Sequence, residues 1–199
     1  MIMMIEWINL GVLLLSAILY LFLYIKSAGP AQLEQKIGES AYSKCAKYRT
    51  IAAVFSFVAV ANYIVYYFYP LPGLPRFFPW DWWISIVIGI IILIPGLYLM
   101  YTGTRDAGEE AIVPKKEHTL YGGIYEIIRH PQAIGEFLLW FSIALWLNSP
   151  FLVLISFLWL PIYYLMCLAE EKDLVIRYGH AYVEYRDRVG FLIPKRKKK

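Results

Sequence analysis

Two short polar segments of this chain combine residue types that can bind charged groups. The first, Arg129-His130-Pro131, directly precedes an apolar run. Proline suits the first turn of a helix, where its missing N–H is not needed, so this segment predicts a helix N-terminus with free amides and a positive dipole end. Such an end favours a carboxylate or a phosphate. On these residues alone, a simple turn at Gly122-Gly123 followed by an interfacial anchor is the alternative.

The second segment, Glu170-Glu171-Lys172-Asp173, carries three acids and directly follows an apolar run. Acidic residues do not favour the C-terminal end of a helix, where the dipole is negative. Either the helix continues beyond them as an amphipathic one, or the acids hold a cation. Apolar and aromatic residues follow at helical spacing, interrupted by Gly179, and favour continuation: Leu174, Tyr178, Tyr182 and Tyr185. A membrane-surface helix with a solvated acidic turn is the structural alternative.

The elements that must position these segments are membrane helices. Hydrophobic residues make up 60% of the chain and charged residues 17%, against about a quarter charged in soluble domains. A membrane-spanning helix needs about 20 apolar residues. Three stretches without Asp, Glu, Lys or Arg meet this: Trp7–Ile25, Ile51–Tyr69 and Trp82–Thr102. A fourth run, Phe137–Ala169, is long enough for two spans, and Asn148-Ser149-Pro150 predicts a tight turn within it.

We therefore expect an all-α, polytopic integral membrane protein with five transmembrane helices. Residues 1–119 hold the first three helices with their cytoplasmic loops. Residues 120–199 hold a helical hairpin and a cytoplasmic C-terminal helix, and we expect the cofactor-binding region there. The fourth helix must begin near Pro131, which carries Glu136 to the membrane boundary. An ionisable residue there is either a partner of the site or an interfacial surface residue.

The basic residues predict the orientation of the chain. With five spans, 18 of the 19 Lys and Arg residues fall on one side, and only Arg76 falls on the other. The positive-inside rule then places the N-terminus outside and the C-terminus and the site in the cytoplasm. The first apolar run has no Lys or Arg before it, so we expect a retained span rather than a cleaved signal. The tail from Lys195 to Lys199 is typical of an anchor for anionic lipid headgroups.

As an ordered set, the motifs of residues 120–199 resemble the isoprenylcysteine carboxyl methyltransferase family. They are Gly123-x-Tyr125-x-x-x-Arg129-His130-Pro131, the apolar hairpin, Glu170-Glu171-x-x-Leu174, Tyr178-Gly179-x-x-Tyr182-x-x-Tyr185 and Ile193-Pro194. The family consists of integral membrane enzymes that use S-adenosylmethionine. Its members methylate the α-carboxylate of a prenylated C-terminal cysteine, and related enzymes methylate phospholipid amines or other small substrates.

The resemblance implies roles for individual residues. The cofactor pocket, which would release S-adenosylhomocysteine as product, would be formed by Gly123, Tyr125, His130, Pro131, Glu170, Glu171 and Tyr182. Arg129 and Glu170 would be catalytic, and Arg129, Tyr185 and Arg188 would contact the substrate. Arg129 either holds the substrate carboxylate or pairs with an acid of the second segment. Tyr182 and Tyr185 are otherwise aromatic residues of the membrane interface. Ala133 stands where the family often has an aromatic residue.

A carboxylate acceptor is already ionised at neutral pH, so the expected methyl transfer needs alignment and exclusion of water rather than a strong base. Expected partners are a lipophilic or prenylated substrate and membrane lipids. We expect no nucleic acid and no metal, because Cys45 and Cys167 lie far apart in unlike surroundings. The alternatives are a phospholipid amine N-methyltransferase, a membrane reductase, and a non-enzymatic membrane scaffold. The acceptor, the oligomeric state and the route of lipid access stay open.

Overall fold

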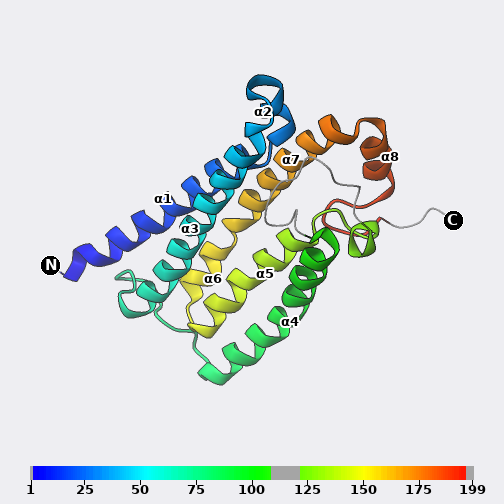
Figure 1. Cartoon of the computed structure of the whole chain (residues 1–199). Coiled ribbons are helices and arrows are strands. Elements are labelled where there is room, and N and C mark those ends of the chain that lie inside the picture. The colour runs from blue at the N-terminus through cyan, green and yellow to red at the C-terminus, as the bar shows by residue number, and fades with distance from the viewer. Residues whose placement is uncertain (1, 109–121, 196–199) are drawn as a thin grey trace.

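The structure, a computed structural model, describes residues 2–108 and 122–195, and its regular elements in these ranges are all helices. In chain order they are α1 (Ile2–Ser27), α2 (Pro30–Ile37), α3 (Ser40–Phe68), α4 (Trp82–Ala107), the 3-10 helix η2 (Gly123–Glu126), α5 (Pro131–Trp146), α6 (Pro150–Ser156), α7 (Trp159–Tyr178) and α8 (His180–Arg188). The all-α prediction is confirmed within these ranges (Figure 1).

Four stretches of the described residues are long and apolar enough to cross a membrane. They are Met4–Ser27, Ser40–Phe68, Trp82–Ala107 and Pro150–Tyr178. By length and composition, the chain is an integral membrane protein. The remaining predicted span, α5, has 16 residues, or about 24 Å of helix at 1.5 Å per residue, which is short of a hydrocarbon core of about 30 Å. The five-helix count therefore stays a prediction.

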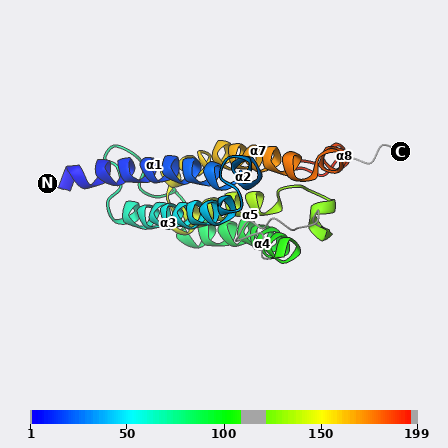
Figure 2. The ribbon, with the colours of Figure 1, turned by 45° about the horizontal axis from the view of Figure 1, so that its top comes forward.

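The helices run side by side in an elongated bundle. Helix α1 packs along α3, and α4 packs along α5. Figure 2 shows α1, α7 and α8 in one layer, with α3 and α4 in the other. Helices α2 and α8 and the C-terminal ends of α4 and α7 lie at one end of the bundle, far from the N-terminus of α1 (Figure 1). We call this the polar end, because it gathers the ionisable segment that precedes α5 and the acidic segment in the C-terminal part of α7.

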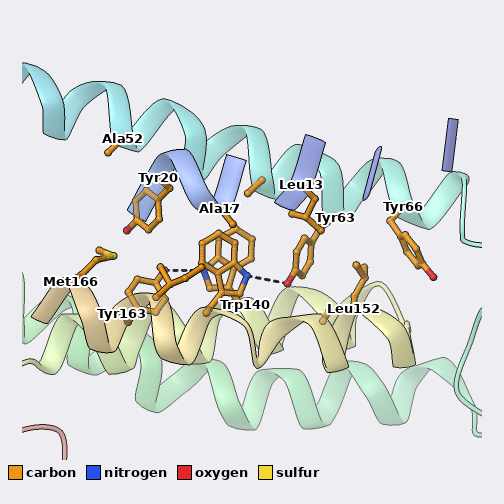
Figure 3. Close-up of a cluster of buried hydrophobic side chains, with 14 of the residues drawn as sticks. Leu13, Ala17, Tyr20, Ala52, Tyr63, Tyr66, Trp140, Leu152, Tyr163 and Met166 are labelled. Carbon is orange, nitrogen blue, oxygen red and sulfur yellow. Dashed lines mark hydrogen bonds between the residues drawn. The ribbon is translucent and has the colours of Figure 1, made fainter. Parts of the chain in front are cut away.

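The centre of the bundle is an aromatic core that joins α1, α3, α5 and α7 (Figure 3). The rings of Trp140 and Trp159 are stacked with their centroids 3.8 Å apart. The indole nitrogen of Trp140 donates to the hydroxyl of Tyr163 at 2.9 Å, and that of Trp159 donates to Tyr63 at 3.2 Å. Since buried indole N–H groups need acceptors, these bonds fix how α5 and α3 pack against α7.

Glycines set the close approach of α4 to α5. A Cβ added at Gly135 would lie 2.6 Å from the carbonyl oxygen of Gly96 and 3.0 Å from the amide of Met100. At Gly103 it would meet Gln132 and Pro131. Small residues at such contacts are typical of membrane helix packing, where backbones approach closely. This packing fixes the beginning of α5 against the end of α4, where the ionisable residues gather.

The predicted turn between α5 and α6 lies at Asn148-Ser149-Pro150. Asn148 has a φ of 52°, the left-handed conformation that Asn tolerates better than most residues. The side chain of Ser149 accepts the amide hydrogen of Leu152 at 3.3 Å, and Pro150 is the first residue of α6. The apolar hairpin expected from the sequence is present, with one irregularity that was not predicted: α6 ends at Ser156 and α7 begins at Trp159.

Candidate functional site

A cavity opens at the polar end of the bundle. Its walls come from α1, α3, α5, α7 and α8, together with η2, the segment just before α5 and the end residues Pro30 of α2 and Ala107 of α4. Of the residues predicted for the site, six line it: Tyr125, Arg129, His130, Glu170, Tyr182 and Tyr185. The fold therefore brings together motif side chains that are up to 60 positions apart in the sequence, from Tyr125 to Tyr185.

Glu170 connects the C-terminal motif to the first helix. The hydroxyl of Tyr24, on α1, donates to Oε1 of Glu170 at 2.6 Å. The other carboxylate oxygen lies 3.5 Å from Nδ1 of His130. The side chain of Glu170 keeps 29% of its exposure, more than that of Glu171. Its carboxylate is thus oriented by two partners and still faces the cavity.

Arg129 pairs with the neighbouring acid. Its Nε donates to Oε1 of Glu171 at 2.6 Å, and both side chains are less than 10% exposed. Its Nη1 donates to the backbone oxygens of Arg186 and Val189, each at 2.7 Å. Buried charges are tolerated when they are paired and hydrogen-bonded in this way. Of the two roles considered for Arg129, the pairing with an acid of the second segment is the one present in the structure.

His130 lies between the two glutamates. Its Nε2 is 3.2 Å from Oε1 of Glu171, opposite the contact of Nδ1 with Glu170. Burial by itself lowers the pKa of His130, but hydrogen bonds to Cys167, Glu170 and Glu171 outweigh it and hold the pKa well above its ordinary value. The imidazole is therefore protonated at neutral pH, and it adds positive charge beside the N-terminus of α5.

The third acid of the second segment has a different role. Oδ1 of Asp173 accepts the backbone amides of Ala31 at 2.8 Å and Gln32 at 3.2 Å, which are the free amides in the first turn of α2. Asp173 thus caps a helix far away in the sequence. All three acids have partners within the chain. Helix α7 also continues beyond them to Tyr178, as the helical spacing predicted, so they do not lie at its C-terminal end.

The tyrosines of α8 face inward. Tyr182 and Tyr185 are 2% and 8% exposed, so they lie inside the protein rather than at a lipid-facing surface. The hydroxyl of Tyr185 donates to the backbone oxygen of Tyr125 at 2.7 Å, and the hydroxyl of Tyr125 donates to the backbone oxygen of Gly103 at 3.2 Å. Burial raises the pKa of Tyr185 to about 12, so it remains a donor at neutral pH. These bonds fasten α8 over the cavity.

Four predicted residues do not line the cavity. Glu171 lies behind it, in the pair with Arg129. Gly123 has a φ of 63° and lies so close to the Asp106 carboxylate that a side chain would clash with it. The same carboxylate accepts the amide of Ile124 at 2.8 Å. Gly123 thus shapes the turn that begins η2. Pro131 is buried at the start of α5, and Arg188 is exposed at the end of α8.

The structure adds cavity residues that the sequence did not identify. Tyr24 on α1 and Arg49 on α3 line it, although the motifs cover only residues 120–199. Glu136, for which the sequence left a partner of the site or an interfacial surface residue open, also lines the cavity and accepts from the hydroxyl of Tyr20 at 3.4 Å, so it lies inside the bundle. The signal for Arg49 was its position two residues before the second apolar run, but its neighbours across the bundle could not be predicted from one sequence.

A second hollow adjoins the first. A groove runs along α3, α4 and α5. The helices α3 and α4 on its two sides have little contact with each other. Five residues line both the cavity and the groove: Tyr24, Arg49, Gln132, Glu136 and Tyr163. We call this set the junction.

Among known proteins, the chain is similar in sequence to methyltransferases. The family described as phospholipid methyltransferase matches residues 84–181, from α4 to the start of α8. A protein-S-isoprenylcysteine O-methyltransferase of Saccharomyces cerevisiae is 32% identical over 117 residues, covering 54% of this chain and 48% of that protein. A methanethiol S-methyltransferase of a Pseudomonas species is 35% identical over 96 residues, covering 47% of this chain and 35% of that protein.

A further relative, methanethiol S-methyltransferase 2 of Bradyrhizobium diazoefficiens, is 30% identical over 101 residues, covering 49% of this chain and 34% of that protein. The matched region thus spans less than half the length of each curated relative. No solved structure matches the chain significantly. These matches confirm the resemblance predicted from the motifs.

Proposed function

We propose that this chain, similar to the isoprenylcysteine carboxyl methyltransferase family in its motifs and in its relatives, transfers a methyl group from S-adenosylmethionine to a lipophilic acceptor. The observation that carries the proposal is the junction, where a polar cavity meets a groove along the membrane helices. A cofactor in the cavity and a lipid in the groove would come together at these residues. A non-enzymatic scaffold does not require this arrangement.

The cavity has the donor and acceptor groups that this cofactor needs. When bound, S-adenosylmethionine supplies a methyl group on a sulfonium cation. The carboxylate of Glu170 would accept hydrogen bonds from its ribose hydroxyls or its ammonium group. The protonated His130 and the N-terminal end of α5 would hold its carboxylate. Tyr125, Tyr182 and Tyr185 would form an aromatic wall, and α8 would exclude water from the site.

The groove suits the apolar part of an acceptor. Apolar residues from three helices line it: Phe57, Val60, Met100, Leu139 and Ile143. Phe57 is 75% exposed, so the groove extends to the outer surface of the bundle. A prenyl or acyl chain partitions into the bilayer. It would therefore enter between α3 and α4, and only its polar end would reach the cavity.

The acceptor group that we favour is the α-carboxylate of a prenylated cysteine. Arg129 lines the cavity but not the groove and is paired with Glu171. The Arg49 side chain lines both, at the place where the polar end of a lipid would meet the cofactor. We therefore assign to Arg49 the binding of the acceptor carboxylate. Because this group is already ionised, the chain needs only to align it and to exclude water. The name of the Saccharomyces relative agrees with this acceptor.

A phospholipid amine is the second candidate. An amine must lose a proton before it can accept a methyl group, so the site would need a base. Glu136, an acid at the junction, lies where such a base would stand. The family description points the same way, and the two methanethiol methyltransferases add a thiol as a third acceptor chemistry.

The positive-inside rule places the polar end at the cytoplasmic face, as the distribution of Lys and Arg predicts. An alkylating reagent that cannot cross membranes tests this orientation. Single cysteines would be introduced at Arg76 and at Lys195 in the double variant Cys45→Ser and Cys167→Ser. In right-side-out vesicles, we expect labelling at position 76 alone. Labelling at position 195 alone would reverse the topology.

The acceptor is tested by product analysis. Purified protein in lipid nanodiscs is incubated with methyl-labelled S-adenosylmethionine and one acceptor at a time. The acceptors are N-acetyl-S-farnesylcysteine, phosphatidylethanolamine vesicles and a small thiol. We expect a base-labile methyl ester on the farnesylated cysteine, and Arg49→Gln should raise KM for that acceptor more than Arg49→Lys does. N-methylated lipid, or a thioether, without any ester would replace the carboxylate with the second or third acceptor. No product from any acceptor would contradict the proposed function.

A further inference from the structure

Three side chains of different chemistry meet on one wall of the polar cavity: His130, Cys167 and Glu170. One ligand atom from each, an imidazole nitrogen, a thiol sulfur and a carboxylate oxygen, lies within 4.8 Å of the other two. Cys167 and Glu170 are three residues apart on α7 and so share one face of the helix. His130 comes from the segment just before α5. His130 and Cys167 are buried, and Glu170 is partly exposed.

The histidine is oriented as a metal ligand would be. Metal-binding histidines usually donate their second ring N–H to a carboxylate, which fixes the tautomer and the plane of the ring. Here Nε2 is 3.2 Å from Oε1 of Glu171, and Glu171 is held in turn by Arg129 at 2.6 Å. Nδ1 is directed to the other side, 3.5 Å from Oε2 of Glu170. The chain thus supplies both the ligand nitrogen and the group that orients it.

We propose that His130, Cys167 and Glu170 form a binding site for a thiophilic divalent cation, for which Zn²⁺ is the best match. Zinc takes sulfur, nitrogen and carboxylate oxygen together, and sites with three protein ligands keep a fourth position open. Here the fourth position would face the cavity. Ligand atoms around tetrahedral zinc are about 3.3–3.8 Å apart, given bond lengths of roughly 2.0–2.3 Å. Nδ1 of His130 and Oε2 of Glu170 already have this separation, at 3.5 Å, and no pair in the set is more than 4.8 Å apart.

The charges of the ligands also suit a divalent ion. Binding of the ion would release the protons of the His130 imidazolium and the Cys167 thiol to solvent. The resulting thiolate, carboxylate and neutral imidazole together carry two negative charges, which balance one Zn²⁺, while Arg129 and Glu171 already neutralise each other. The site stands on this geometry and does not require the proposed function. If the proposed function also holds, the ion and S-adenosylmethionine would compete for His130 and Glu170, and zinc would inhibit the enzyme.

The probe is Co²⁺, which gives a near-ultraviolet charge-transfer band when a thiolate binds it. Protein without an affinity tag, in detergent and without S-adenosylhomocysteine, is titrated with Co²⁺ and then with Zn²⁺. We expect one Co²⁺ per chain, a charge-transfer band, and its loss when Zn²⁺ is added. Cys167→Ser should abolish the band, and Glu170→Gln should weaken Co²⁺ binding by about tenfold or more.

The matched control is Cys45→Ser, because Cys45 is also a buried free cysteine but lies on α3, where its thiol donates to the backbone oxygen of Lys26. This variant should keep the band. Circular dichroism verifies that each variant is folded. No band in the folded wild type, or a band that persists in Cys167→Ser, would overturn the metal site. Titration with S-adenosylhomocysteine in metal-free buffer tests the proposed function separately.

Discussion

The hydroxyl of Tyr24 donates a hydrogen bond of 2.6 Å to the carboxylate of Glu170, across 146 positions of sequence. This bond links a helix outside the recognised motifs to the acid that faces the cavity. The first half of the chain therefore takes part in the candidate site, through Tyr24 on α1 and Arg49 on α3, rather than serving only as a membrane anchor.

Removal of this hydroxyl should loosen Glu170. In Tyr24→Phe the ring stays and the bond to a charged acceptor is lost, which costs about 1.5 kcal/mol of stability. We expect S-adenosylhomocysteine to bind up to about tenfold more weakly, which calorimetric titration measures. Tyr101→Phe, at a residue that is 68% exposed on α4, is the control and should change neither quantity. Equal affinities in wild type and Tyr24→Phe would show that the bond does not orient the site.

The pair of Arg129 and Glu171 should be important for stability. Glu171→Ala leaves a buried guanidinium without its carboxylate, and breaking a buried pair in this way costs about 3 kcal/mol. The midpoint of thermal unfolding, followed by circular dichroism in detergent, should fall clearly. Glu184→Ala removes the i,i+4 partner of His180, in a pair whose side chains are 84% and 70% exposed, and should leave the midpoint almost unchanged. Similar midpoints for the two variants would refute the prediction.

The protonation of His130 makes stability depend on pH. Its pKa is raised in the folded chain by Cys167, Glu170 and Glu171, relative to about 6.5 in an unfolded chain. The contribution of the imidazolium is therefore fully present below about pH 6.5 and is lost as the pH rises through the folded pKa. The unfolding midpoint should decrease as the pH rises above about 6.5, with a shallower decrease in His130→Gln. Parallel pH profiles for the two proteins would contradict this assignment.

The groove should determine how well the lipid chain of the acceptor binds. Val60 lines it from α3, so Val60→Trp should fill part of it and raise KM for a farnesylated acceptor by about tenfold. The affinity for S-adenosylhomocysteine should not change, because Val60 does not line the cavity. Val54→Trp, at a residue on the same helix that is 55% exposed, is the control. An unchanged KM in Val60→Trp would place the lipid elsewhere.

Much of the bundle follows from the sequence. The runs beginning at Trp7 and Trp82 lie within α1 and α4, and the run beginning at Ile51 ends one residue after α3, because uncharged runs of this length form helices in lipid. The boundaries were less accurate. Helix α3 begins at Ser40 rather than near Ile51, since a membrane helix need not end where its apolar run does. The eight-residue α2 was not predicted, because its N-terminus is capped by the distant Asp173.

The site, too, could be predicted only in part from the sequence. The motifs around His130 and Glu170 identified one side of the cavity, since these residues recur at recognisable spacings. The roles of the three acids depend on partners far away in the sequence: Tyr24, Arg129 and the amides of α2. Periodicity and composition carry no information on such contacts. For the same reason, the junction and the cluster that includes Cys167 emerge only in three dimensions.

The most direct test of the account is calorimetric titration of S-adenosylhomocysteine into the purified chain in metal-free buffer. We expect one binding site per chain, and a loss of affinity of at least tenfold in Glu170→Gln, with Glu184→Gln as the exposed control on α8. The absence of binding to folded protein, or an affinity that is the same in wild type and Glu170→Gln, would contradict the cofactor site.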